Sequence, residues 1–168
     1  RPTSILVDAA NKMAVGDLDF KLAIDSTDEI GTLAKAVEGV QSSVQRMTAD
    51  ANMLAKAAVD GKLSTRADAN KHQGDFQAIV KGVNDTLDAV INPLNVAANY
   101  VDRISKGDIP AKITDSYNGD FNILKNNLNT CVDAVNLLVS DAGMLAKAAV
   151  DGKLATRADT AKHQGDFQ

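Results

Sequence analysis

Two histidines and one cysteine are the rarest residues of this chain among those that could ligate a metal, accept a phosphoryl group or act as nucleophiles. His72 and His163 occupy the same polar context, Lys-His-Gln-Gly-Asp-Phe, whereas a phosphoacceptor histidine is expected on an exposed helical face before an acidic residue. One histidine and the distant Cys131 are too few ligands for a metal site. We therefore predict a structural or solvent-facing role for both histidines, with no catalytic residue, no metal and no cofactor.

Other residues with reactive side chains also have structural interpretations. The adjacent carboxylates Asp28 and Glu29 stand where a helix should begin, which is capping geometry. No glycine belongs to a phosphate-binding loop, because none has the spacing followed by Lys-Ser or Lys-Thr. Cys131 falls on an apolar seam and is predicted to be a small buried hydrophobe, and a single cysteine fits a reducing compartment. The chain is therefore predicted not to be an enzyme.

Composition excludes several partners. The net charge is −4, and both signs are interspersed along the 168 residues, so no basic stripe indicates nucleic acid. The chain has no Trp and only 4% aromatic residues, fewer than one globular core of this size normally uses. Its even spread of Ala and Val favours slender packed helices. We predict no small-molecule substrate. No apolar run approaches the roughly 20 residues of a membrane span.

An internal repeat organises the sequence. Residues 51–77 return as residues 142–168 with 23 of 27 positions identical, an offset of 91 residues. The 91-residue period contains two shorter units, because a glycine recurs at spacings of 45, 46 and 45 residues. Each glycine is followed by a connector and an acidic residue. Glycine ends a helix and an acidic residue favours the start of the next. The predicted units span residues 1–47, 48–92 and 93–138, with a partial unit at 139–168.

Long apolar seams lie between the connectors. Steps of three and four residues predict helices over 30–60, 76–106 and 121–151, with the spacing of a coiled-coil bundle. The predicted seam residues are Ile30, Leu33, Val37, Val40, Phe76, Val83, Leu87, Val90, Phe121, Leu128, Cys131 and Val135. Two helices per unit cannot bury such a wide stripe, which predicts a homodimer with four helices per unit. The connector is long enough for both helices of a unit to run in parallel.

These features resemble tandem HAMP modules, the linkers of bacterial transmembrane receptors, sensor histidine kinases and methyl-accepting chemotaxis proteins. The marks of the resemblance fall into four groups. They are the prolines near a first helix (Pro2, Pro93), the glycines that stop it (Gly16, Gly61, Gly107, Gly152), the connector pins (Leu18, Leu63, Ile109, Leu154), and the acids that open the second helix (Glu29, Asp75, Asp120, Asp166). Glu29, within Asp-Glu-Ile-Gly, is the most specific mark.

The resemblance implies an all-α fold of parallel, homodimeric four-helix bundles stacked end to end through continuous helices. It also implies a relay that passes a conformational change from a transmembrane or sensor region to a cytoplasmic output domain of the kinase or chemotaxis type. The chain would then be an excerpt of a membrane-anchored protein, on the cytoplasmic side of the inner membrane.

Three alternatives stay open. The first is a passive dimeric coiled-coil spacer, which would have one conformation where a relay has two. The second is the dimerisation region of a histidine kinase, which would require phosphorylation of His72. The third is a ligand-binding helical bundle, which would need a polar-lined cavity.

Overall fold

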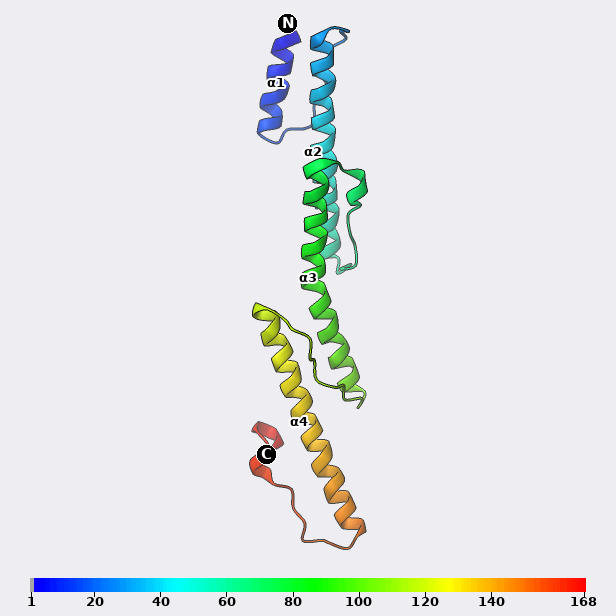
Figure 1. Ribbon diagram of the computed structural model, residues 1–168, viewed down its shortest axis with the longest axis vertical. Coiled ribbons are helices and arrows are strands. Elements are labelled where there is room, and N and C mark those ends of the chain that lie inside the picture. The colour runs from blue at the N-terminus through cyan, green and yellow to red at the C-terminus, as the bar shows by residue number, and fades with distance from the viewer. Residues whose placement is uncertain (1) are drawn as a thin grey trace. The chain divides into compact units, whose positions relative to one another are not determined.

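The computed structural model describes residues 2–168, and regular structure in that range is helical, without strands (Figure 1). The elements are α1 (Pro2–Ala14), α2 (Glu29–Val59), η1 (Ala69–Lys71), α3 (Gly74–Ser105), α4 (Gly119–Val150), η2 (Thr160–Lys162) and η3 (Gly165–Phe167), where η denotes a 3-10 turn. The long helices confirm the three predicted ones to within two residues. Within residues 2–168, no helix combines the length and the apolar character that crossing a membrane requires.

The chain divides into two compact parts, residues 1–89 and residues 90–168. The N-terminal part contains α1, α2 and the first half of α3. The C-terminal part contains the rest of α3, then α4 and the last connector. Each part is described by itself.

In the N-terminal part, α1 packs against the first half of α2, and the two helices run in the same direction (Figure 1). Leu6 and Ala9 of α1 and Ala34 of α2 are buried. The second half of α2 forms a second pair with the start of α3. There Leu54 of α2, Ala67 of the connector and Val80 of α3 form one apolar cluster. A single helix, α2, therefore serves two successive helix pairs.

The C-terminal part repeats this arrangement. The end of α3 and the start of α4 are joined by a connector that buries Ile113. Tyr100 of α3 donates a hydrogen bond to the carbonyl oxygen of Ala111 at 2.8 Å, which holds this connector to the helix. Val132 of α4 is only 1% exposed, the lowest value among the large side chains. The second half of α4 carries the last connector with η2.

The glycines at the predicted stops follow the ends of helices. Gly61 has φ +72°, and its N–H and that of Lys62 donate to the carbonyl oxygens of Ala58 and Ala57 at 3.1 and 2.8 Å. These are the two bonds of a Schellman motif, which turns the chain out of α2. The same left-handed conformation is found at Gly16, Gly107 and Gly152.

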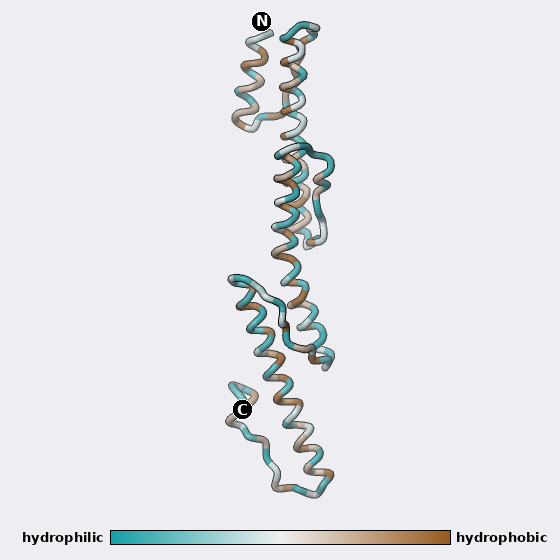
Figure 2. The backbone as a smooth tube through the Cα atoms, viewed as in Figure 1, coloured by the Kyte–Doolittle hydropathy of each residue, from teal (hydrophilic) through white to brown (hydrophobic). Residues whose placement is uncertain are grey.

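Large apolar side chains stay exposed within the single chain along α2, α3 and α4. Figure 2 shows the hydrophobic positions recurring along these helices. Four of the predicted seam residues are large and exposed: Leu33, Val40, Val83 and Val90. The others are half-buried, apart from Cys131. Isolated apolar residues at a surface are ordinary, but the exposed seam residues recur along two helices, α2 and α3.

Cys131 is exposed within the single chain, and its neighbour Val132 is the buried residue. The reason is rotational: the face of α4 that receives the connector is the one bearing Val132 and Asn129, and the predicted seam lies beside that face. The burial of Cys131 was predicted for the apolar seam between two copies, and that stays a prediction.

Candidate functional site: the connectors and their attachment to the helices

The start of α2 is capped by Asp28, and Glu29 is the first helical residue. Asp28 Oδ1 accepts hydrogen bonds from the N–H groups of Ile30 and Gly31 at 2.9 and 3.1 Å. The Ser26 hydroxyl donates to the same oxygen at 2.6 Å. The Ser26 hydroxyl, first of all, and then the Gly31 N–H hold the pKa of Asp28 below its ordinary value. The sequence named Glu29 as the acid that starts this helix, and the structure assigns the cap itself to Asp28.

The later helices begin differently. Asp75 and Asp120 occupy the second positions of α3 and α4, behind Gly74 and Gly119, which have positive φ. Their carboxylates lie in the first turn, where the positive end of the helix dipole favours them. Asp166 lies in the 3-10 turn η3.

Gly31 explains why the Asp-Glu-Ile-Gly sequence belongs to the first unit alone. A Cβ atom at this position would lie 1.8 Å from the backbone oxygen of Ser26, because the connector passes directly over the helix there. No side chain fits without moving the connector. At the corresponding positions, three residues after Gly74 and Gly119, the other units have Gln77 and Asn122.

The two prolines occupy different environments. Pro2 is the first residue of α1, where a missing N–H costs nothing. Pro93 lies inside α3, where it removes the hydrogen bond to the carbonyl oxygen of Ala89.

The connectors are attached by residues other than some of the predicted pins. Leu18 and Ile109 are half-buried, but Leu63 and Leu154 are 42% and 75% exposed within the chain. All four predicted pins come two residues after a stop glycine, so that position alone does not decide whether the side chain is buried. The structure buries Ala67 and Ile113, four residues after Leu63 and Ile109.

An asparagine holds each of these buried connector residues. Asn84 of α3 accepts from the N–H of Ala67 at 3.1 Å and donates to its carbonyl oxygen at 2.8 Å. Asn129 of α4 makes the same two bonds with Ile113, at 2.7 and 3.0 Å. Each amide therefore satisfies both backbone groups of one buried residue. We call this arrangement the asparagine clamp.

Ion pairs and a glutamine complete the attachments. Arg66 pairs with Asp88 at 2.6 Å, and Lys112 pairs with Asp133 at 2.7 Å, one residue before each clamped residue. In the first unit, buried Gln41 donates to the carbonyl oxygens of Leu18 and Phe20 instead.

The apolar spacing and the stop glycines do not predict the clamp. Its one signal in the sequence is an asparagine nine residues after both Asp75 and Asp120, inside a helix, where asparagine is a poor helix former.

The two histidines are buried and paired with aspartates. His72 Nε2 lies 2.7 Å from Asp50 Oδ2, and the His72 side chain is only 1% exposed. His163 Nε2 lies 2.8 Å from Asp141 Oδ2 in the same arrangement, 91 residues later. Each histidine thus ties the end of a connector to the helix that precedes it. Among residues 2–168, no group of three or more His, Cys, Asp or Glu side chains is placed to hold a metal ion.

The chain is a series of parallel helix pairs. A connector joins the two helices of each pair, and each pair shares one helix with the next. This arrangement defines a class of repeated helical linker. Family comparisons identify that class. Residues 1–46 match the HAMP domain model, and residues 71–137 match a second HAMP domain model. This chain therefore belongs to the HAMP domain family and contains HAMP domains in tandem. No solved structure matches the chain.

Proposed function

We propose that the chain forms a parallel homodimer and relays a conformational change along the array, from a sensor or transmembrane region to a cytoplasmic kinase or chemotaxis output domain. HAMP domains are signal-relay linkers in receptors, and they are not themselves catalytic. The observation that supports the relay is the sharing of α2 between two helix pairs. A rotation or tilt imposed on α2 beside α1 has to reach the pair that α2 forms with α3, because both pairs use the same helix.

The uncovered apolar faces support the dimer. A chain with an exposed row of Leu and Val along its helices loses free energy on association at about 25 cal/mol per Å² of apolar surface removed from water. A second copy in the same direction offers an identical row. Parallel pairing would also place matching seam positions opposite each other, so Cys131 would face its symmetry mate.

Cysteine oxidation tests the parallel dimer. Mild oxidation of the chain is expected to give a covalent dimer through Cys131, which is exposed in the single chain. The control is Asp133→Cys in a Cys131→Ser background, because Asp133 pairs with Lys112 and so lies on the connector face. Rapid cross-linking at 131 and slow cross-linking at 133 supports the proposal. Equal rates, or a monomer in dilute solution, contradict it.

Spin labels distinguish a relay from a passive spacer. A label in the second half of α2 of each protomer reports the distance between the two copies. A relay should show two distance populations close in free energy, and Leu33→Ala in the first half of α2 should change their ratio. A spacer should show one population that Leu33→Ala leaves unchanged.

A kinase dimerisation region is not supported by the histidines. Phosphoryl transfer needs an accessible imidazole, whereas His72 and His163 are buried against aspartates. We propose a structural role for both.

A further inference from the structure

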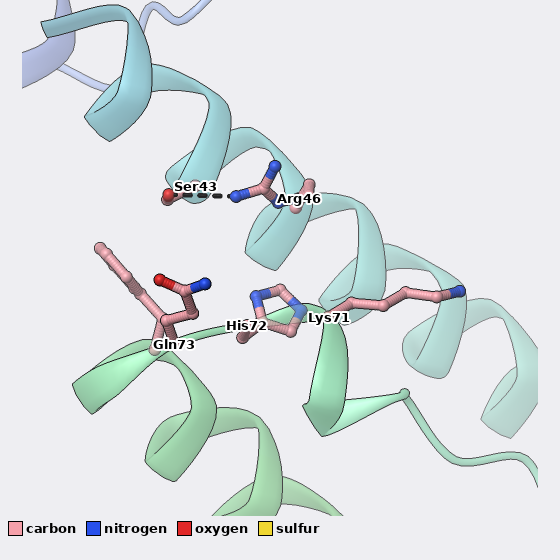
Figure 3. A pocket seen from close by; sticks show the side chains of 6 residues that line it. Ser43, Arg46, Lys71, His72 and Gln73 are labelled. Atoms are coloured by element: carbon pink, nitrogen blue, oxygen red, sulfur yellow. Dashed lines mark hydrogen bonds between the residues drawn. The ribbon is translucent and has the colours of Figure 1, made fainter. Parts of the chain in front are cut away.

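A pocket of about 260 Å³ lies where α2 meets the end of the second connector and the beginning of α3 (Figure 3). All of it belongs to the N-terminal part. The six residues that line it are Ser43, Arg46, Lys71, His72, Gln73 and Phe76. It is polar, unlike the apolar seams that the sequence led us to expect, and no established feature of the relay requires it.

The charged groups of the pocket are both cationic. Arg46 comes from α2 and Lys71 from η1, and no carboxylate is among the lining residues. The Lys71 ammonium points away from Arg46 and from the His72 ring (Figure 3) and lies 4.0 Å from Asp68 Oδ2, so Arg46 is the cation that an anion beside His72 would meet. Arg46 Nη2 donates to the Ser43 hydroxyl at 3.2 Å rather than to a carboxylate. Its guanidinium keeps further N–H groups available, since arginine carries five. The lining therefore favours an anion.

His72 provides an independent indication of a ligand. Its Nε2 is occupied by Asp50, but its Nδ1 is buried and has no hydrogen-bond partner. Buried polar atoms nearly always have a partner, so an orphaned one beside a pocket indicates what the pocket can hold. Figure 3 shows the imidazole edge facing the space between Gln73 and α2. With a proton on each ring nitrogen, Nδ1 donates to an anion while Nε2 donates to Asp50.

The second copy of the repeat provides a comparison within the same molecule. A pocket in the C-terminal part is lined by the equivalent Lys162, His163, Gln164 and Phe167. Its wall differs, because Ala134 and Leu137 stand at the positions of Ser43 and Arg46, and Asp133 adds a carboxylate. The histidine–aspartate pair is thus common to both copies, and the cationic wall belongs to the first alone.

We infer that the first pocket binds a small tetrahedral oxyanion, of the sulfate or phosphate type, through Arg46 and His72 Nδ1. Donors arriving from α2 and from the buried imidazole suit an anion with oxygens in several directions. The bound anion would bridge α2 to the end of the connector. It would therefore stabilise the arrangement in which His72 is seated against α2. The binding does not depend on relay activity, so the two proposals can fail separately.

Histidine NMR on the whole chain tests the site, since its two imidazoles report the two pockets separately. Sodium sulfate is titrated at constant ionic strength, with chloride as the balancing anion. We expect a saturable change in the His72 ring signals, with a Kd on the order of 1 mM, and no change at His163.

The matched variant is Ser43→Ala with Arg46→Leu, which gives the first pocket the wall of the second. Its sulfate affinity should fall by about tenfold or more, the loss expected for one charge-assisted hydrogen bond. An unchanged circular dichroism spectrum and an intact His72–Asp50 signal establish that the variant folds. Inorganic phosphate and methyl phosphate, titrated in parallel, distinguish a free anion from a phosphate group carried on a larger molecule.

Several outcomes would overturn the inference. They are an equal response of His163, an unaltered affinity in the double variant, or no saturable change at His72 in any titration. Acetate binding as tightly as sulfate would also overturn it, because a carboxylate from a second copy of the chain could then fill the pocket.

Discussion

Gly31→Ala offers the sharpest test of how the first connector is attached. The added Cβ would lie 1.8 Å from the Ser26 backbone oxygen, whereas real Cβ contacts are essentially never under 3.0 Å. Connector and helix must therefore separate by more than 1 Å. Overpacking of this kind costs about 1–3 kcal/mol. The movement also strains the bonds that Asp28 makes with Ser26 and with the Gly31 N–H.

Gly39→Ala is the matched control, because the same change in the same helix meets nothing within 4 Å. There the substitution should stabilise α2 by about 0.5–1 kcal/mol, through helix propensity alone. The two substitutions should therefore change the free energy of unfolding in opposite directions. For a chain of this size, 1 kcal/mol corresponds to roughly 2–4 °C in Tm.

Thermal unfolding followed by circular dichroism at one protein concentration compares the three chains, since association makes Tm concentration-dependent. Hydrogen exchange of the Ile30 and Gly31 amides locates the effect. We expect Gly31→Ala to melt below the parent and Gly39→Ala above it. A Gly31→Ala chain that melts at or above the parent would refute the close approach of the connector.

Three further predictions follow from the attachments. Asp50→Ala leaves both ring nitrogens of His72 without a partner, so it should lower the free energy of unfolding by about 1–3 kcal/mol. Amide hydrogen exchange at the end of the connector should become faster, and Asp141→Ala in the second copy of the repeat is the comparison variant. Asn84→Leu removes both clamp bonds to buried Ala67 and should destabilise by about 1–3 kcal/mol, with proteolysis concentrated in residues 60–73; an unchanged cleavage pattern would contradict the clamp. Asp28 has a folded-state pKa below its ordinary value of 3.8. The stability that it contributes is therefore present above pH 3.8 and is lost as the pH falls through the folded pKa. Asp28→Asn should lose less stability below pH 3.8 in acid titrations, and identical curves for the variant and the parent would count against the cap.

The sequence predicted the helices well because their signals are local. A three-four spacing of apolar residues, a stop glycine and a first-turn carboxylate each act within a few residues of where they stand. Gly61 and Asp75 are both examples, and the helices ended and began beside them. The family resemblance depends on the same local marks.

The attachments were harder to predict because they depend on contacts between distant residues. Asn84 reaches Ala67, 17 residues earlier, and His72 reaches Asp50, 22 residues earlier. Which connector side chain turns inward depends on how the chain leaves the stop glycine, and that path is not encoded in apolar periodicity. Leu63 was therefore taken for a pin, while the smaller Ala67 takes the buried position.

The sharing of α2 between two helix pairs restricts how such arrays can lengthen or shorten. The chain cannot be divided between two helix pairs without interrupting a helix, because each boundary between pairs falls inside a helix that both pairs share. A viable insertion or deletion has to splice one helix to another at corresponding positions. The near-identity of residues 51–77 and 142–168 matches such an event, because the two copies lie at corresponding positions, 91 residues apart.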